Sequence, residues 1–423
     1  MPRGEKILIT GPASQVALPI ARSLAEHNEV HGLARFGRAA DRERLEAFGV
    51  RCIPFDLATG CVDDLPDDYA YVLNFAIVKS REDDYDYDLA ANAEGVGRLM
   101  AHCCAARAFL HCSSAAVYQH AEGKPAKEGD PLGDNHRAIL PTYSICKIAA
   151  ETLVRFAARQ WNLPTTIVRL SVPYGANGGW PWIHLALMRA GHPIPLHTEQ
   201  PNVFNPIHED DYVAQIPRLL EIAAVPATVV NWGGSEPASI EEWCAYLGEL
   251  TGIEPSFRTT DATVAPLPVD LTRMHELVGR TQLGWRDGIR RMVEARAPEL
   301  LVFYPGDDTP VCTRQLCDYR DNLAVFADLG VDVLALNSQS IASHEKFAKK
   351  HALPFPLLAD TDRSVCKAYG AAGLLGMTKR ALVLVGKDGR ILWRRTDLPI
   401  FHRSAEELRE VIEGLGTGSD PAA

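Results

Sequence analysis

The chain has 423 residues, which is enough for two or three domains of ordinary size. Hydrophobic residues make up 47% of it and charged residues 23%, values that exclude a disordered chain, a collagen-like repeat and a coiled-coil rod. With 43 Lys and Arg against 54 Asp and Glu, the net charge of -11 argues against nucleic acid or an anionic membrane as the main partner.

Cellular location is predicted from what the sequence lacks. It has no secretory signal pattern and no stretch approaching about 18 uncharged apolar residues, so we expect a cytoplasmic protein without a membrane-spanning segment. Ten cysteines in 423 residues are too few for a disulfide scaffold, and we expect most to be reduced thiols.

Short apolar runs alternate with helical patterns through the first third of the chain. Strands are expected at residues 6–10, 29–34, 50–54, 70–75, 108–112 and 165–170, and helices at 16–26 and 41–48. This alternation is typical of an α/β protein with a doubly wound parallel sheet, the Rossmann arrangement. Pro and Gly interrupt the pattern from about 175 to 298, where we expect a small substrate lobe with a helix at 239–251.

The alternation restarts near residue 300 and predicts a second α/β unit. Strands are expected at 301–304, 331–337 and 380–385, and helices at about 312–329 and 344–351. The predicted domains are therefore 1–298, with a Rossmann core to about 174, and 299–415, followed by a disordered tail at 416–423. The junction has one Pro and no Gly/Ser tract, so we expect closely abutted domains.

The turn after the first strand is the candidate dinucleotide site. Of the glycines expected there only Gly11 is present, although Ser14 is small enough for a close backbone approach; cofactor binding and an ordinary strand-to-helix turn fit about equally well. The second strand is followed by Arg35 and Arg38 rather than by an acid, which favours NADP over NAD. The alternative is that both arginines are solvated loop charges.

Tyr143 and Lys147 are the candidate acid/base pair. Their spacing of four residues places both on one face of a helix, where an ammonium group would lower the pKa of the phenol. Ser114 ends an apolar strand at the sheet edge where ligands bind, and it is placed to hydrogen-bond a reacting oxygen.

Together these residues resemble the extended short-chain dehydrogenase/reductase family, which includes nucleotide-sugar epimerases and dehydratases, over about residues 5–295. The matching motifs are Ser113-Ser114-Ala115-Ala116-Val117-Tyr118, Tyr143 with Lys147, Asp56-Leu57, Asn92, Arg169-Leu170, Pro173-Tyr174-Gly175 and Ile207-His208-Glu209-Asp210-Asp211. The resemblance implies that Tyr143 is the acid/base, that Lys147 lowers its pKa and holds the nicotinamide ribose, and that Ser114 polarises the substrate oxygen. It assigns cofactor contacts to Gly11, Ser14, Gln15, Arg35, Arg38, Asp56, Leu57, Phe75, Ala76, Asn92 and Lys147.

The resemblance also narrows the reaction. Ala115 and Ala116 follow Ser114 where sugar 4,6-dehydratases of the family carry Asp-Glu, so dehydration is not expected. Net oxidation or reduction of a carbonyl or alcohol is favoured; epimerisation of a nucleotide sugar and a non-catalytic nucleotide-binding redox sensor are the alternatives. Because the helices near Asn92 and Tyr143 commonly form the family's dimer interface, the resemblance favours a homodimer.

Cys312 is the candidate nucleophile of the second unit. It lies in the first turn of a predicted helix, whose positive dipole end stabilises a thiolate. Thr309 can offer a hydroxyl to the same place, and Pro310 fixes the turn that precedes Cys312. Cys366, within a later helical pattern, is expected to be a packing residue. No metal site is expected in either unit.

The Pro305-x-x-x-Thr309-x-x-Cys312 signature resembles the peroxiredoxins of the AhpC/TSA type, most closely the bacterioferritin-comigratory group, and implies a thioredoxin fold. The resemblance implies that Cys312 attacks a peroxide and becomes a sulfenic acid, with Thr309 and Arg380 stabilising the polarised peroxide. Cys317 would then condense with it to a disulfide, which thioredoxin or a glutaredoxin would reduce.

Two features of this unit carry structural expectations. Cα atoms five residues apart on a helix are roughly 8 to 9 Å apart, whereas a disulfide tolerates at most about 7 Å, so the helix start must unwind. The family's opening hairpin and first helix are missing before residue 301, so the unit is N-terminally shortened. Either the first domain covers the gap, or the site is exposed and its activity weakened; a docking module without activity is the alternative.

Overall fold

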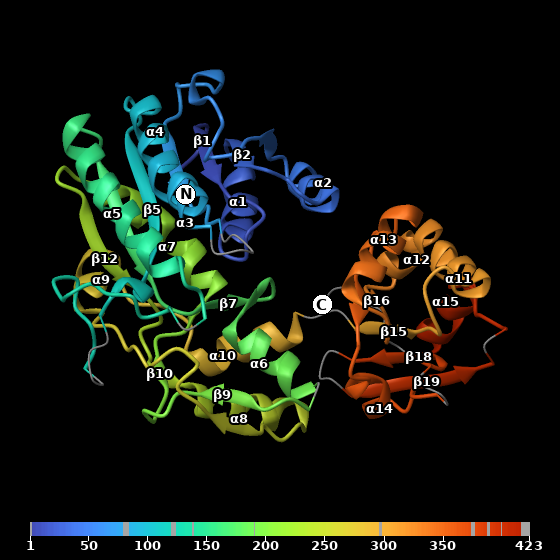
Figure 1. The fold of residues 1–423 in the computed structure, drawn as a ribbon. Coiled ribbons are helices and arrows are strands. Elements are labelled where there is room, and N and C mark those ends of the chain that lie inside the picture. Colours follow the sequence, from blue (N-terminus) through green and yellow to red (C-terminus); the bar gives the residue numbers. More distant parts are fainter. Residues whose placement is uncertain are drawn as a thin grey trace. The chain divides into compact units, whose positions relative to one another are not determined.

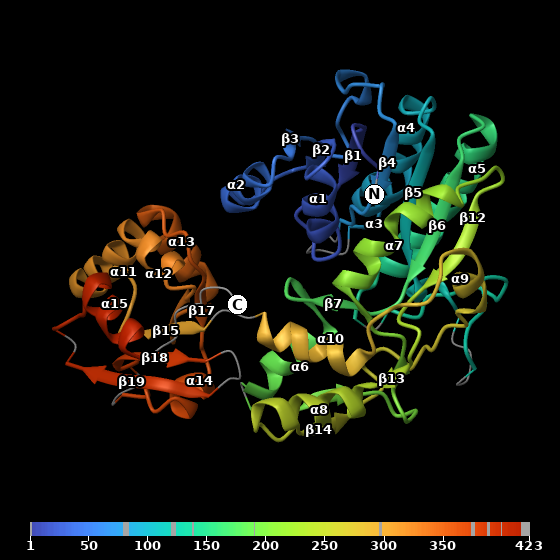
Figure 2. The ribbon, with the colours of Figure 1, turned by 180° about the vertical axis from the view of Figure 1, so that it is seen from behind.

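The computed structural model (Figures 1 and 2) forms two compact units, made up of residues 1–188, 193–249 and 254–292 and of residues 189–192, 250–253 and 293–423. The residues that the structure describes are 2–78, 84–119, 124–137, 139–189, 191–295, 298–373, 377–386, 390–398 and 400–415. The tail predicted at 416–423 lies outside them. Among the described helices, none has both the length and the apolar character needed to cross a bilayer.

The first unit is built on a seven-stranded parallel sheet, as the alternating pattern predicts. Its strands, in the order β12-β6-β5-β4-β1-β2-β3, are Thr228–Trp232, Thr165–Leu170, Ala108–Ser114, Tyr71–Asn74, Lys6–Thr10, Glu29–Ala34 and Arg51–Pro54. The chain order reverses between β1 and β4, and the carboxyl edge of a doubly wound sheet at such a point is where ligands bind.

Helices cover both faces of this sheet (Figures 1 and 2). On one face α4 (Gly95–His102) and α5 (Tyr143–Gln160) pack on a core that includes Leu8, Val72 and Phe109. The other face carries α1 (Ala17–Ala25) and α7 (Glu209–Glu221), which contact each other. The remaining elements before the lobe are α2 (Ala39–Ala47), η1 (Val62–Asp64), α3 (Tyr85–Leu89), the π-turn η2 (Ala90–Glu94) and η3 (Ala115–Val117).

The lobe consists of short elements that follow β6. They are β7 (Pro173–Gly175), β8 (Gly178–Gly179), α6 (Trp180–Arg189), β9 (Ile194–Leu196), β10 (Val203–Phe204), β11 (Ile207–His208), β13 (Ala238–Ser239), α8 (Ile240–Thr251), β14 (Phe257–Thr259), α9 (Thr272–Leu277) and α10 (Trp285–Glu294). Asp211 at the start of α7 accepts hydrogen bonds from the backbone N–H groups of Gln282 (2.6 Å) and Leu283 (3.1 Å). This buried carboxylate fixes the end of the lobe to the Rossmann core.

A buried ion pair joins three elements behind the carboxyl edge. The Arg169 guanidinium on β6 donates two hydrogen bonds to the Glu151 carboxylate on α5, at 2.9 and 2.8 Å. The Ser113 hydroxyl on β5 donates to the same carboxylate at 2.6 Å, and both charged side chains are at most 2% exposed. A bidentate pair with this burial fixes α5 relative to the strands that it covers.

The second unit is a five-stranded mixed sheet with helices, the predicted thioredoxin-like α/β fold. Its strands, in the order β17-β16-β15-β18-β19, are Leu357–Ala359, Asp332–Asn337, Glu299–Phe303, Arg380–Val385 and Ile391–Asp397; the first three are parallel, and β18 and β19 are antiparallel to their neighbours. Its helices are α11 (Pro310–Asp321), α12 (Leu323–Asp328), α13 (Ile341–His351), α14 (Ser364–Ala368) and α15 (Ala405–Gly414).

The single helix predicted at about 312–329 is wrong, because α11 ends at Asp321 and α12 is a separate helix. Asn322 lies between them with φ -113°, and its side-chain amide donates to the backbone carbonyl (2.9 Å) and carboxylate (3.0 Å) of Asp318. An Asn side chain that bonds the preceding turn competes with continuation of a helix. The other predicted elements are displaced by three residues or fewer at their ends.

The buried ion pair generates a stability prediction. Replacing Glu151 by Gln leaves the Arg169 guanidinium buried without its counter-charge, and we expect a loss of about 3 to 5 kcal/mol in the free energy of unfolding. The measurement is denaturant unfolding of the full chain. The control is Glu221→Gln, because the Arg218–Glu221 pair is more than half exposed and should contribute little. Equal, small effects of the two substitutions would contradict a structural role for the buried pair.

Candidate active sites

The turn between β1 and α1 requires its glycine. Gly11 has φ +63°, and a Cβ atom there would lie 2.9 Å from the Cα atom of Ala76 after β4. The Thr10 hydroxyl accepts hydrogen bonds from the backbone N–H groups of Phe75 (3.1 Å) and Ala76 (3.0 Å). The ends of β1 and β4 are thereby held together at the point where the strand order reverses.

The start of α1 suits an anionic group. Ser14 accepts a hydrogen bond from the Ala17 N–H at 3.3 Å, and the first turn of α1, described throughout, contains no acidic residue. The positive end of the helix dipole therefore faces the turn without a competing carboxylate, which fits a dinucleotide pyrophosphate. The Gln15 side chain donates to the Pro173 carbonyl at 2.9 Å, so this predicted cofactor residue connects the turn to β7.

The two arginines after β2 have different surroundings. Arg35 donates to the Tyr87 hydroxyl at 3.0 Å, and that hydroxyl donates to the Asp56 carboxylate at 2.7 Å. Arg38 forms an ion pair with Asp41 at the start of α2 (2.6 Å). The structure therefore brings together Arg35 and Asp56, two predicted cofactor residues, through Tyr87, which sequence analysis missed and which no motif marks.

Asn92 and Leu57 act on the backbone near this edge. In the π-turn, the Asn92 amide group donates to the Val78 carbonyl (2.8 Å) and accepts from the Val78 N–H (2.7 Å). The buried Leu57 offers its carbonyl to Arg98 at 2.6 Å. Asn92 thus holds the segment after β4, next to Phe75 and Ala76, in a fixed conformation.

Ser114, Tyr143 and Lys147 lie together at the carboxyl end of β5 and the start of α5. The Ser114 hydroxyl is hydrogen-bonded to Tyr143 and accepts from the Ala116 N–H at 3.2 Å. The Lys147 ammonium donates to the Cys112 carbonyl at 2.6 Å and lies 6.0 Å from the centre of the Tyr143 ring. The three residues that the motifs predict to act together are therefore neighbours.

The expected lowering of the Tyr143 pKa by Lys147 is wrong for the chain alone. Burial raises the pKa of Tyr143 to about 12, although the hydrogen bond to Ser114 lowers it in part. Burial also lowers the pKa of Lys147, whose ammonium is directed to the Cys112 carbonyl. Tyr143 is therefore a phenol at neutral pH and is ready to donate its proton.

A buried polar chain behind this site was missed by sequence analysis. The Thr10 hydroxyl donates to the Asn74 side-chain oxygen (2.6 Å), and the Asn74 amide nitrogen lies 2.9 Å from Nδ1 of His111. Burial lowers the pKa of His111 well below its usual value, so its imidazole is neutral. These residues occupy strand positions that read as apolar runs, and their pairing depends on strand order.

A hollow of about 740 Å³ lies in the first unit. It is lined by Gln119, Asp134, Asn135, Arg137, His197, Glu199, Asp261, Thr263 and Ala265. Two of these residues flank His136, whose ring centre is 5.7 Å from that of Tyr143, and Gln119 follows the turn that begins at Ser114. The hollow therefore adjoins the segments that carry the candidate acid/base.

In the second unit a cation lies beside the candidate nucleophile. Nη2 of Arg380, the first residue of β18, is 3.2 Å from the Cys312 sulfur in the first turn of α11, and both residues are 1% exposed. The same guanidinium donates to the side chain of Gln315. A buried guanidinium at this distance stabilises a thiolate. The Thr309 hydroxyl donates to the Gly306 carbonyl at 3.0 Å within the preceding turn.

Asp307 holds that turn in place. Its carboxylate accepts hydrogen bonds from the Tyr304 hydroxyl (2.8 Å), the Asn337 amide (3.1 Å) and the Ser343 hydroxyl (2.5 Å), and it pairs with His344 at 3.0 Å. The carboxylate therefore connects the ends of β15 and β16 to α13. Sequence analysis missed this cluster because the partners of Asp307 lie up to 37 residues away from it along the chain.

The second cysteine of α11 faces a different neighbour. The helix is continuous through Cys312 and Cys317, and both thiols are free. Residues five apart are rotated by about 140° around a helix; accordingly, Cys312 faces Arg380, while the Cys317 sulfur lies 4.0 Å from Nδ1 of His351 on α13. Cys366 is fully buried, as expected for a packing residue, and burial raises its pKa to about 11.

Family models match both units. Residues 7–231 match the NAD dependent epimerase/dehydratase family, and residues 291–394 match the AhpC/TSA family. The putative peroxiredoxin bcp of Coxiella burnetii (strain RSA 493 / Nine Mile phase I) is 45% identical over 71 residues, which are 17% of this chain and 47% of that protein. The chloroplastic peroxiredoxin Q of Sedum lineare is 44% identical over 94 residues, which are 22% of this chain and 50% of that protein. The chain thus spans half or less of the length of these relatives.

Solved structures share the fold. The UDP-glucuronic acid 4-epimerase of Bacillus cereus, in complex with UDP-glucuronic acid and NAD, has a TM-score of 0.60 at 18% identity, covering 69% of this chain and 98% of that one. The UDP-N-acetylglucosamine 4-epimerase of Methanobrevibacter ruminantium M1, in complex with UDP-N-acetylmuramic acid, has a TM-score of 0.61 at 13% identity, covering 70% and 98%. Because both identities are below 25%, the similarity to these structures shows a shared fold only.

The Arg380–Cys312 contact generates a reactivity prediction. Replacing Arg380 by Met removes the cation that stabilises the anionic sulfur, so we expect alkylation of Cys312 by iodoacetamide at pH 7 to slow about tenfold. The rate is measured by mass spectrometry of the Cys312 peptide. Arg314→Lys, an exposed substitution on the same helix, is the control and should leave the rate unchanged. An unchanged rate in Arg380→Met would contradict the assigned electrostatic role.

Proposed function

Because the chain belongs to the NAD dependent epimerase/dehydratase family and carries an AhpC/TSA domain behind the matching region, we propose that it is a bifunctional redox enzyme. Its first unit oxidises or reduces a carbonyl or hydroxyl substrate with NAD(P), and its second unit reduces peroxides at the expense of thiols. The observation that carries the proposal is that each unit gathers its reactive side chains: Ser114, Tyr143 and Lys147 in one, Cys312 and Arg380 in the other.

In the first unit, Tyr143 acts as the acid in the reducing direction. Its pKa of about 12 keeps the proton on the phenol at neutral pH, and the proton is given to the substrate oxygen as hydride reaches the carbonyl carbon. Ser114 hydrogen-bonds the same oxygen, and Lys147 holds the nicotinamide ribose. A bound nicotinamide supplies or accepts the hydride.

The cofactor that we propose is NADP, with NAD as the alternative. Support for NADP comes from exposed Arg35 and Arg38 after β2, where no acid is present to bind a ribose 2'-hydroxyl. NAD is favoured by the complex of the Bacillus cereus epimerase. The pyrophosphate would lie at Gly11, Ser14 and the start of α1.

The substrate is proposed to enter from the hollow beside Tyr143. Its lining mixes basic, acidic and amide side chains, including Arg137, His197 and Asn135, which suits a polar ligand with hydroxyl groups. The alternative reaction is epimerisation of a nucleotide sugar, which the UDP-sugar complexes of the similar structures favour.

In the second unit, Cys312 attacks one peroxide oxygen, the O–O bond breaks, and water or an alcohol leaves. Arg380 stabilises the thiolate and the polarised peroxide, and Thr309 hydrogen-bonds the peroxide after turning from Gly306. The sulfenic acid on Cys312 then forms a disulfide with Cys317, and thioredoxin or a glutaredoxin restores both thiols.

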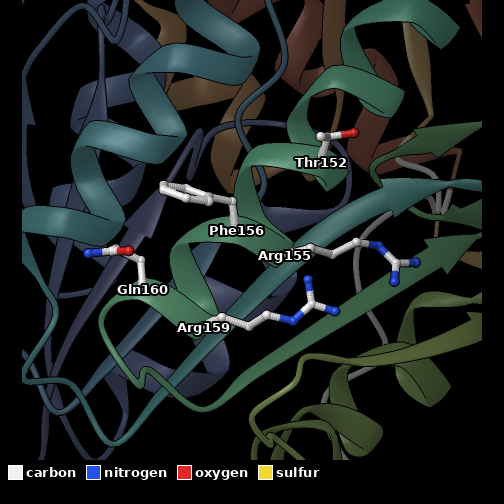
Figure 3. Close-up of a pocket in the computed structure, with 5 residues that line it drawn as sticks. All are labelled: Thr152, Arg155, Phe156, Arg159 and Gln160. Carbon is white, nitrogen blue, oxygen red and sulfur yellow. The ribbon is translucent and has the colours of Figure 1, made fainter.

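The outer face of α5 is proposed to be the contact of a homodimer. Thr152, Arg155, Phe156, Arg159 and Gln160 border a shallow hollow of about 400 Å³ there (Figure 3). The Phe156 ring is 56% exposed and packs edge-on against Trp161. A large aromatic ring with two neighbouring arginines has the composition of an interface anchor.

A nicotinamide assay tests the first activity. UDP-glucose and UDP-glucuronic acid are supplied with NADP or NAD; rising absorbance at 340 nm indicates net oxidation, whereas product isomers without net absorbance change indicate epimerisation. We expect Tyr143→Phe to bind NADPH normally but to lose at least about 100-fold in turnover, because the proton donor is gone. The matched control is Tyr71→Phe, because Tyr71 is the first residue of β4 and lies at the end of that strand away from the carboxyl edge of the sheet. Full activity in Tyr143→Phe would refute its role, and cofactor binding without turnover of any substrate would favour a nucleotide-binding sensor.

A peroxide assay tests the second activity. With thioredoxin, thioredoxin reductase and NADPH, the wild type should consume hydrogen peroxide and Cys312→Ser should not, because the nucleophile is absent. Cys317→Ser should form the sulfenic acid but fail to turn over with thioredoxin. Cys104→Ser, at an exposed thiol, is the control, and omission of thioredoxin corrects for NADPH oxidation by the first unit. Activity that survives in Cys312→Ser would remove the basis of the assignment.

A further inference from the structure

We propose that His351 is the general base that deprotonates Cys317, and that Asp308 positions its imidazole. The inference rests on the proposed peroxide-reducing function of the second unit. It concerns the disulfide-forming step, in which Cys317 must become a nucleophile although an ordinary thiol has a pKa near 8.5 and is a few per cent thiolate at pH 7.

The imidazole lies between a thiol and a carboxylate. The Cys317 sulfur, on α11, is 4.0 Å from Nδ1 of His351, the last residue of α13. On the other side of the ring, Nε2 lies 3.7 Å from a carboxylate oxygen of Asp308. A nucleophile, a base and a group that orients the base form the arrangement that activates nucleophiles, and such contacts are often long in the resting state and shorten during reaction.

Charged and aromatic side chains surround this ring. From α11 the Arg320 guanidinium donates to the backbone carbonyl of His351 at 2.6 Å, and from α13 the Phe347 ring packs edge-on at 4.9 Å. Lys350 pairs with Asp308, and the ammonium lowers the pKa of that carboxyl, as does the His351 imidazole. Asp308 is therefore a carboxylate that stabilises the imidazolium formed when His351 takes a proton.

Asp308 is itself held in an uncommon conformation. Its φ of +56° lies in the left-handed region, which a non-glycine residue keeps only where the surrounding contacts hold it. It stands between Asp307, whose carboxylate is bound by four side chains, and Thr309, which precedes α11. The turn that presents Cys312 therefore also places the carboxylate that faces His351.

The step balances without a further reactant. Cys317 gives its proton to Nδ1 of His351, and the thiolate attacks the sulfur of the Cys312 sulfenic acid. The S–S bond forms, the S–O bond breaks, and the departing hydroxide becomes water by taking a proton from solvent, while the imidazolium returns its proton to solvent. Because Cys317 and Cys312 face different sides of α11, the proton is removed while the helix is intact, and the thiolate then reaches Cys312 as the helix unwinds.

The test separates the two chemical steps. The reduced full chain is mixed with one equivalent of hydrogen peroxide between pH 6 and 9, quenched with an alkylating reagent, and analysed for the Cys312 sulfenic acid and for the disulfide. We expect His351→Gln to form the disulfide about tenfold more slowly at pH 7 and to approach the wild-type rate near pH 9, where the thiol ionises unaided. The control is Lys349→Gln, an exposed position on α13 two residues before His351, and this variant should match the wild type.

The outcomes distinguish this inference from the proposed function. If the wild type forms no sulfenic acid on Cys312, the proposed peroxidase function fails. If His351→Gln forms both the sulfenic acid and the disulfide at wild-type rates and with the wild-type pH profile, the role of His351 is refuted. If His351→Gln slows both steps equally, Asp308→Asn decides: a slower disulfide step alone supports the proposal, and wild-type behaviour overturns it.

Discussion

Three buried cations set the positions of the reactive groups in this protein. Lys147, Arg169 and Arg380 are 5%, 1% and 1% exposed, and a charge with so little water must find partners inside the protein. Lys147 donates to the Cys112 carbonyl, Arg169 pairs with Glu151, and Arg380 lies between Cys312 and Gln315. Each partner belongs to a strand or helix that also carries a candidate catalytic group, so satisfying the charge fixes the geometry of the site.

The two units place their candidate reactive side chains in the same way. In both units the reactive side chain lies in the first turn of a helix packed on a sheet: Tyr143 opens α5, and Cys312 is the third residue of α11. The surroundings then differ in a way that matches each task. Burial keeps Tyr143 protonated, as its proposed role as an acid requires, whereas the Arg380 guanidinium lies 3.2 Å from the Cys312 sulfur, where it would stabilise the proposed anionic nucleophile.

The sequence predicted what is local and missed what depends on tertiary contacts. The strands at 6–10, 29–34, 165–170 and 380–385 coincide with β1, β2, β6 and β18 because apolar runs with clear flanking signals define them. The helix across Asn322 was wrong because the periodic pattern continues through a residue whose side chain bonds the preceding turn. Motif spacing identified Ser114, Tyr143 and Cys312, and the family resemblance identified Arg380, whereas the contact of Gln315 with Arg380 joins residues 65 apart and forms only on folding. The pKa of Tyr143 was misjudged for the same reason, since burial is a property of the assembled fold.

The turn before α11 is anchored to the rest of the second unit at several points. Asp307 contacts Ser343 near the start of α13, and Asp308 contacts Lys350 at its end, so the turn is attached to one helix at two separated points. Cys312 is further held against the first residue of β18. Cys317, past this anchored region, has a long contact to His351. In the proposed disulfide step the Cys312 sulfur would therefore stay in place and Cys317 would move to it, so that the conformational change would fall on the helical turns after Cys312.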